Sequence, residues 1–217
     1  MEYGRFIVLE GGEGAGKSSA MKMLEAYLPR ENTVFTREPG GTPLAQKIRQ
    51  MLLQEAVEGA HTNVIEEPIE ISPLTHFALF WAARRAHVEE IIAPALKAGR
   101  NVVCDRFDAS TWAYQIWGQE QPELIPLFRM MREHFVIRDA RPYLYVYLDV
   151  EPEVGIARTK RRGIENEFDK KTIEFYKRVQ RGYREFLGSY PCRSIDANRP
   201  EPEVSLDVLE VVMSALA

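Results

Sequence analysis

A glycine-rich segment behind a short apolar run constrains this chain more than any other feature. Residues 6–9 read Phe-Ile-Val-Leu, a continuous apolar stretch typical of a strand buried on both faces of a sheet. Residues 11–18 read Gly-Gly-Glu-Gly-Ala-Gly-Lys-Ser, which is Gly, four variable residues, Gly, Lys and Ser. A helical pattern follows from residue 17 to residue 28 and ends at Pro29. A strand, a glycine loop and a helix in this order predict a phosphate-binding P-loop.

Each residue type in this loop has a physical task at a phosphate group. Glycines let backbone N–H groups turn toward phosphate oxygens, and the N-terminus of the next helix adds partial positive charge. We expect Lys17 to reach the β- and γ-phosphates of a nucleotide and the Ser18 hydroxyl to supply a ligand to Mg²⁺. The predicted nucleotide contacts are Gly11, Gly12, Glu13, Gly14, Ala15, Gly16, Lys17, Ser18 and Ser19. The pattern itself does not separate kinases from ATPases and GTPases.

Short apolar runs alternate with helical patterns along the rest of the chain. Further strands are predicted at residues 33–36, 101–104, 143–148 and near 193–195. Helices are predicted at 42–52, 72–98, 110–117, 122–136, from 152, and at about 170–187 and 201–215. This alternation predicts an α/β fold: a parallel five-stranded sheet between two layers of helices, the three-layer P-loop kinase fold. No linker or repeat divides the sequence, so residues 1–217 are predicted to form a single domain.

Three segments outside the loop carry structural expectations of their own. In the helix at 42–52, Leu44, Ile48, Met51 and Leu52 are expected to face inward. Residues 54–71 are acidic and irregular, which predicts a loop or a short excursion. Residues 158–162 hold four cations in five positions, and a glycine and an acidic stretch follow them. This pattern predicts a mobile lid at about 158–169 rather than a packed helix, able to deliver cations onto reacting phosphates.

Asp105 and Arg106 follow the predicted strand at 101–104. Ligands of parallel α/β sheets bind beyond the carboxyl ends of the strands. An acid at that place can hold the magnesium shell, and an arginine beside it can neutralise transferring phosphate oxygens. The alternative is a surface pair that caps the next turn. The position at a strand end next to the predicted loop favours a functional role.

Composition excludes several other classes of protein. The formal net charge of the 217 residues is −4, whereas proteins that bind a nucleic-acid backbone usually carry a basic excess. Two cysteines are too few for a disulfide framework or a zinc site. The sequence holds no signal-peptide pattern and no apolar run of membrane-spanning length. We therefore expect a cytoplasmic protein that acts on small nucleotides, with neither nucleic acid nor membrane as a partner.

Phe80 and Arg84 are four residues apart on a predicted helix and therefore share one face. A ring and a guanidinium side by side can stack on a nucleobase and pair with one of its carbonyl oxygens. The commoner arrangement is a core phenylalanine with an arginine at the rim. The spacing leaves both readings open, and Tyr114 and Gln115 are likewise compatible with ordinary helix positions.

Five segments taken in order resemble bacterial thymidylate kinase. They are residues 6–18, Thr-Arg-Glu-Pro-Gly-Gly-Thr at 36–42, Phe-Trp-Ala-Ala-Arg at 80–84, Asp-Arg-Phe-Asp-Ala-Ser-Thr-Trp-Ala-Tyr-Gln at 105–115, and Tyr-Leu-Asp-Val at 147–150. The resemblance implies transfer of a phosphoryl group from ATP to dTMP in the presence of Mg²⁺, giving dTDP and ADP. It also implies a homodimer with the long helix at 72–98 in the interface. Another nucleoside monophosphate or deoxynucleoside kinase, or a slowly hydrolysing switch protein, are the alternatives.

The same resemblance implies roles for individual residues. The substrate-binding set is Glu13 at the sugar and phosphate, Arg37 and Arg106 at the phosphate, Phe80 stacked on thymine, Arg84 at a thymine carbonyl, and Ser110, Tyr114 and Gln115 around the base and deoxyribose. The P-loop holds Ala15 and no arginine, which implies that the catalytic cation comes from the lid. The catalytic set is then Lys17, Arg106, Lys160 and Arg162, with Arg158 at the bound nucleotide, and Ser18 and Asp105 at the metal.

Overall fold

The computed structural model describes residues 3–53, 71–162 and 171–217. The predicted acidic loop lies outside these ranges except for residue 71. Residues 163–169 of the predicted lid also lie outside them. No helix in the described ranges has both the length and the apolar character needed to cross a membrane.

Five parallel strands form one sheet, as the sequence predicts. The strands are β1 (Phe6–Gly11), β2 (Thr33–Arg37), β3 (Asn101–Asp105), β4 (Leu144–Asp149) and β5 (Cys192–Asp196). Their order across the sheet is β2-β3-β1-β4-β5, so the strand that leads into the glycine loop is central. In sheets of this kind the ligand crevice opens where the strand order reverses, beside the first strand. The fold therefore places the loop in the middle of the crevice.

The helices of the first half of the chain are α1 (Lys17–Tyr27), α2 (Pro43–Leu53), α3 (Pro73–His87), η1 (Val88–Ile92), α4 (Ala93–Lys97), α5 (Asp108–Thr111) and η2 (Trp112–Gly118). Those of the second half are η3 (Pro122–Leu124), α6 (Ile125–Arg132), η4 (Glu133–Ile137), α7 (Arg138–Ala140), α8 (Pro152–Arg162), α9 (Ile173–Leu187) and α10 (Glu201–Leu216). The segments η1, η2 and η4 are π-helical turns that continue the helices before them. The predicted start of the long helix is confirmed, because the Ser72 side chain accepts a hydrogen bond from the Thr75 N–H.

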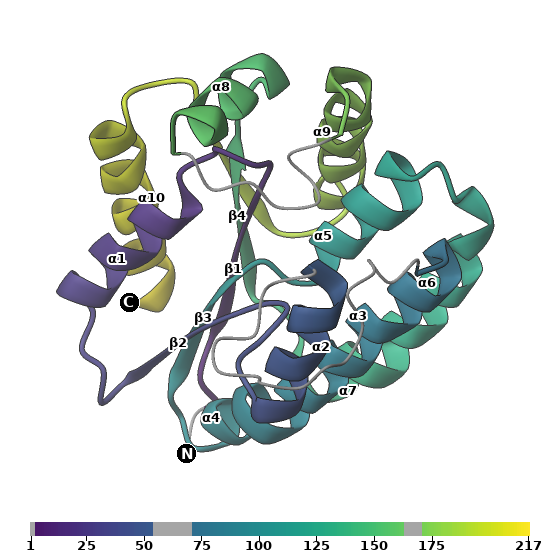
Figure 1. The fold of residues 1–217 in the computed structure, drawn as a ribbon. Coiled ribbons are helices and arrows are strands. Elements are labelled where there is room, and N and C mark those ends of the chain that lie inside the picture. The colour runs from purple at the N-terminus through teal and green to yellow at the C-terminus, as the bar shows by residue number, and fades with distance from the viewer. Residues whose placement is uncertain (1–2, 54–70, 163–170) are drawn as a thin grey trace, which may run out of the picture.

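Alternation along the central strand divides the interior into two cores. Phe6 and Val8 of β1 face a large core with α3, the helices at 108–140 and α9, whereas Ile7 and Leu9 face a core with α1 and α10. Successive side chains of a strand point to opposite faces, so an unbroken apolar run fills both cores. Figure 1 shows α1 and α10 on one side of the sheet and α3, α6 and α9 on the other. The predicted three-layer architecture is confirmed.

The buried face of α2 is narrower than predicted. Ile48 and Leu52 are buried as expected, but Leu44 is 53% exposed and Met51 is 48% exposed. The third buried position is Ala45, which is spaced three and seven residues from the other two. The prediction for Leu44 and Met51 was wrong because apolar character alone does not mark the edge of a helical stripe.

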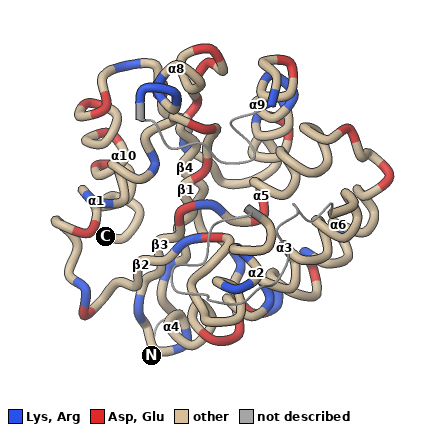
Figure 2. Tube along the Cα trace, viewed as in Figure 1, with Lys and Arg blue, Asp and Glu red and all other residues tan. Residues whose placement is uncertain are grey.

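The predicted lid begins inside a regular helix. The expectation that residues 158–162 do not form helix is wrong, because α8 continues through Arg162. Its last turns are blue in Figure 2, where the cations follow one another along the trace. Cations near the C-terminus of a helix interact favourably with the helix dipole, and this segment contains no helix-breaking residue. The glycine at 163 lies outside the described residues.

Candidate nucleotide-binding site

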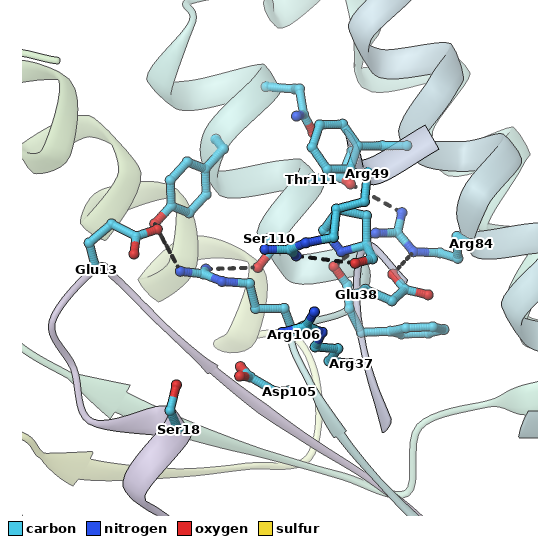
Figure 3. A pocket seen from close by; sticks show the side chains of 15 residues that line it. Glu13, Ser18, Arg37, Glu38, Arg49, Arg84, Asp105, Arg106, Ser110 and Thr111 are labelled. Carbon is cyan, nitrogen blue, oxygen red and sulfur yellow. Dashed lines mark hydrogen bonds and ion pairs between the residues drawn. The ribbon is translucent and has the colours of Figure 1, made fainter. Parts of the chain in front are cut away.

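A cavity of about 210 Å³ opens at the carboxyl ends of β1, β2 and β3. All eight predicted substrate-binding residues line it: Glu13, Arg37, Phe80, Arg84, Arg106, Ser110, Tyr114 and Gln115. Ser18 and Asp105, the two predicted metal ligands, line it as well. In Figure 3 these two lie on one side of the pocket and Arg84 on the other. The cavity thus runs from the start of α1 to the middle of α3.

The glycine loop is held by its own lysine and by α8. The Lys17 ammonium donates to the carbonyl oxygens of Gly11 and Gly12, at 2.9 Å each. Gly14 has a φ of +70°, and a Cβ there would lie 2.2 Å from the Gly155 carbonyl oxygen. Only glycine combines this backbone conformation with so close a contact. The loop is therefore packed directly against the first turns of α8.

Burial lowers the pKa of Lys17 to about 8, and the charge of Arg106 acts in the same direction. Asp105, Glu13 and Glu10 oppose this shift but do not cancel it. An ammonium with a lowered pKa is poorly stabilised by its own surroundings. Phosphate oxygens in contact with it would therefore raise its pKa and be bound strongly in return.

Arg106 connects the glycine loop to the cavity. Its guanidinium donates to the Glu13 carboxylate at 2.8 Å, to the Gly11 carbonyl at 3.0 Å and to the Tyr183 hydroxyl at 3.0 Å. Figure 3 shows it between Glu13 and Ser110. Its φ is +70°, in the left-handed region that residues with a side chain seldom adopt. Backbone strain of this kind clusters at functional sites, where the surrounding structure enforces it.

Glu10 binds the segment that follows Arg106, and it was not identified as a site residue from the sequence. Its carboxylate is fully buried and accepts hydrogen bonds from the Phe107 N–H at 2.8 Å and from the Ser110 N–H and hydroxyl at 3.2 and 2.7 Å. Burial raises the pKa of Glu10, and the hydroxyl of Ser110 and the charge of Arg106 oppose the rise. Glu10 thereby fixes the turn that carries Arg106 and Ser110.

Asp105 and Ser18 fit the chemistry of a magnesium site. The Oδ1 atom of Asp105 is buried and has no hydrogen-bond partner. No group of three or more His, Cys, Asp or Glu side chains within the described ranges could hold a metal ion by itself. Mg²⁺ is usually bound by one or two protein oxygens, with waters and substrate phosphates completing its octahedron. One carboxylate and one hydroxyl beside a phosphate loop match that requirement.

The far end of the cavity holds Arg84, which belongs to the core. Arg84 is only 2% exposed, and its guanidinium lies over the rings of Trp81 and Phe107 at 4.7 and 5.2 Å. Phe80 is half-buried and lines the cavity. The alternative of a core phenylalanine with an arginine at the rim is therefore wrong. A flat ring and a buried donor face the same recess.

Tyr114 and Gln115 come from the π-helical turn η2. The Tyr114 hydroxyl donates to Glu13 at 3.2 Å. The side-chain amide oxygen of the buried Gln115 has no hydrogen-bond partner. Single π-helical turns occur frequently at functional sites. Here the wider turn lets two successive side chains line one cavity.

A second cavity of about 490 Å³ lies on the other side of the glycine loop, against α8 and the start of α10. Arg158 and Arg161 line it together with Gly14, Ala15 and Gly16. Arg158 donates to the carbonyl oxygens of Gly14 at 3.3 Å and Ala197 at 2.7 Å. Lys160 is exposed and lines neither cavity, and the side chain of Arg162 lies outside the described part of the chain.

Comparison with known proteins decides the family. Residues 9–208 match the family described as thymidylate kinase. The chain belongs to the thymidylate kinase family. The thymidylate kinase of Alkalilimnicola ehrlichii is 39% identical and that of Caulobacter vibrioides 38%, each over 100% of this chain and over 95% and 99% of the relative. The crystal structure of thymidylate kinase from Ehrlichia chaffeensis is 29% identical with a TM-score of 0.71, over 97% of this chain and 99% of that one.

Five further residues line the first cavity of this thymidylate kinase family member: Glu38, Pro39, Phe107, Thr111 and Arg49. Glu38 and Pro39, joined by a cis peptide bond, lie in the segment at 36–42 that already marked the family. Arg49 lies on α2 and donates to the Pro39 carbonyl at 3.2 Å. Nothing in the sequence distinguishes Arg49 from an ordinary surface arginine of a helix, so only the fold reveals it.

Proposed function

We propose that this chain transfers the γ-phosphoryl group of ATP to dTMP, giving ADP and dTDP. One observation carries the proposal: a single cavity runs from the phosphate loop and Arg106 to Phe80 and Arg84. A nucleoside monophosphate offers a phosphate at one end and a base at the other, which is the order of groups along this cavity. The family of the chain supports ATP as the donor.

Arginines and one ring define the acceptor in this proposal. Arg37, Arg49 and Arg106 line the cavity and neutralise the acceptor phosphate. Phe80 stacks on the base, and Arg84 donates to a base carbonyl. Three arginines beside one phosphate favour a monophosphate acceptor, because a nucleoside acceptor has no phosphate for them to hold.

The donor lies along the glycine loop. Loop N–H groups, the N-terminus of α1 and Lys17 hold its phosphates. Ser18 and Asp105 would hold Mg²⁺, which supplies charge neutralisation at the donor phosphates when bound. Arg158 and Arg161 line the side of the loop that faces away from the acceptor, so this second cavity suits the nucleoside end of ATP.

The reaction requires positioning and charge compensation rather than a covalent enzyme intermediate. The attacking phosphate oxygen of dTMP is ionised at pH 7, so no strong general base is needed. In this proposal, Lys17 and Arg106 contact the reacting phosphates and spread their charge. Lys160 and Arg162 on α8 stay our prediction for the cations that the lid contributes. A homodimer also stays a prediction, which the sedimentation coefficient of the purified chain tests.

An acceptor panel tests the proposal. The purified protein is mixed with Mg-ATP and dTMP, dUMP, dCMP, AMP, GMP or no acceptor, and ADP release is followed. We expect release to depend on the acceptor and to be fastest with dTMP. Equal release with and without acceptor would instead indicate a hydrolysing switch protein. A preference for dCMP, AMP or GMP would assign the chain to a different monophosphate kinase activity.

A further inference from the structure

His87, the last residue of α3, is fully buried and lines neither cavity. It follows Arg84 by three residues and so lies on the same face of the helix. A buried histidine is commonly a core residue that fills space and satisfies its two ring nitrogens. The partners of this one connect it to the base end of the acceptor cavity.

Both ring nitrogens of His87 contact the segment at 36–42. Nδ1 lies 3.0 Å from Oε1 of Glu38, and Nε2 lies 2.7 Å from the Thr36 hydroxyl. A carboxylate can only accept, so the Nδ1–H donates to Glu38 and, in a neutral ring, Nε2 accepts from Thr36. Gly41 fits against the same ring, since a Cβ there would lie 2.5 Å from Cδ2 of His87. One side chain of α3 thus contacts Thr36, Glu38 and Gly41 of the segment.

The other oxygen of Glu38 holds Arg84. Oε2 of Glu38 accepts from Nε of Arg84 at 2.8 Å, within a pair that is almost fully buried. The terminal nitrogens of Arg84 donate to the Thr111 hydroxyl at 3.1 Å and to the Phe107 carbonyl at 2.9 Å. A guanidinium has five N–H groups, and these three hydrogen bonds leave one N–H on each terminal nitrogen of Arg84 available. Glu38 therefore has one oxygen for each partner, and His87 sets the rotation of its carboxylate.

We propose that His87 is a positioning residue for recognition of the acceptor base. By holding one oxygen of Glu38, it turns the other oxygen onto Nε of Arg84, so that the two remaining N–H groups of Arg84 meet carbonyl oxygens of the base. This inference rests on the proposed phosphorylation of dTMP. It predicts that His87 affects acceptor binding and leaves the phosphoryl-transfer step and ATP binding unchanged.

Two amide variants separate this role from simple filling of the core. In His87→Asn, the amide nitrogen lies close to the position of Nδ1 and can still donate to Glu38. In His87→Gln, the amide reaches the position of Nε2 and Thr36, and Oε1 of Glu38 loses its donor. Loss of one hydrogen bond to a charged group corresponds to roughly a tenfold change in affinity. We expect His87→Gln to raise KM for dTMP by about tenfold, with kcat and KM for ATP within about twofold of wild type.

The matched variant and a second acceptor complete the test. His87→Asn should keep KM for dTMP within about threefold of wild type, since the donor to Glu38 is retained. The preference for dTMP over dCMP should fall in His87→Gln, because cytosine presents an amino group in place of one carbonyl. Equal rises in KM for the two variants, or an unchanged KM in His87→Gln, would overturn the proposal. So would a loss of kcat with KM unchanged.

A third variant keeps the proposal testable if either amide variant folds poorly. Thr36→Val leaves the ring in place and removes the hydroxyl that fixes Nε2. We expect a rise in KM for dTMP of about threefold with unchanged kcat, and no rise would count against the proposal. Failure of the wild-type protein to phosphorylate dTMP would contradict the proposed function itself. An active wild type with an unaffected His87→Gln would contradict only the role of His87.

Discussion

The contact between α8 and the glycine loop gives a sharp prediction for Gly155→Ala. A Cβ at this position would lie 2.3 Å from the Glu13 carbonyl oxygen. Carbon and oxygen atoms in contact are normally at least about 3.3 Å apart, so helix and loop must separate by about 1 Å. The hydrogen bond from Arg158 to Gly14 is already 3.3 Å long and would be lost. The backbone of Glu13 would also shift, and with it the Glu13 carboxylate that pairs with Arg106 at 2.8 Å.

The expected effect is on turnover rather than on folding. A displacement of about 1 Å among positioning groups can lower the rate by about 10²-fold. Alanine favours the helix by about 1 kcal/mol over glycine, and this gain offsets part of an overpacking cost of about 1–3 kcal/mol. We therefore expect kcat to fall between tenfold and a hundredfold, with a thermal unfolding midpoint close to that of wild type.

Steady-state kinetics with dTMP and Mg-ATP measure this effect. Ala157→Ser is the matched control, because it adds one heavy atom to an exposed position of the same helix. The control should keep wild-type kcat. A Gly155→Ala enzyme with kcat within about twofold of wild type would refute the view that α8 positions the loop for catalysis.

Three further predictions concern charge. Because the pKa of Lys17 is lowered to about 8, its ammonium is charged below that pH and neutral above it, so kcat/KM for ATP should be flat below pH 8 and fall above it. A profile that stays flat to pH 9.5 would contradict this. Asp105→Asn should raise the Mg²⁺ concentration for half-maximal rate by roughly tenfold, measured by magnesium titration, with chelation of the metal stopping turnover. Arg132→Met would leave the Asp108 carboxylate buried without its ion-pair partner, which lies at 2.6 Å, and should destabilise the fold by about 3–5 kcal/mol in urea unfolding. An unchanged urea midpoint would count against it.

The sequence predicts the sheet through local patterns, and it predicts the residues of the cavity through motifs that resemble the family. An apolar run followed by a glycine loop places β1 in the centre of the sheet, and the short segments around Arg37, Arg84 and Arg106 each fall at a strand end or on a helix that borders the crevice. Segments that end at the same edge of one parallel sheet are brought together by the topology itself. Topology therefore explains why these segments meet, whereas the roles of Arg37 and Arg84 follow only from the resemblance to the family, because the spacing of Phe80 and Arg84 fits a core pair equally well.

The residues that sequence reasoning missed act through contacts between distant segments. Glu10 lies in an apolar strand and holds a turn that begins 97 residues later, and nothing near it in the chain indicates that partner. Arg49 resembles any arginine on an amphipathic helix. The exposure of Leu44 and Met51 depends on the rotation of α2 about its axis where it packs on α3. Sequence periodicity indicates which stripe of the helix is apolar, but it does not give this rotation.

The central claim is that the phosphoryl group moves from ATP to dTMP within one site. Single-turnover mixing of the enzyme with γ-labelled ATP and dTMP, followed by separation of the products, tests it most directly. The proposed function predicts that the label appears in dTDP, and that omission of dTMP leaves it in ATP over the same time. Label that appears in inorganic phosphate at the same rate with and without dTMP would contradict it.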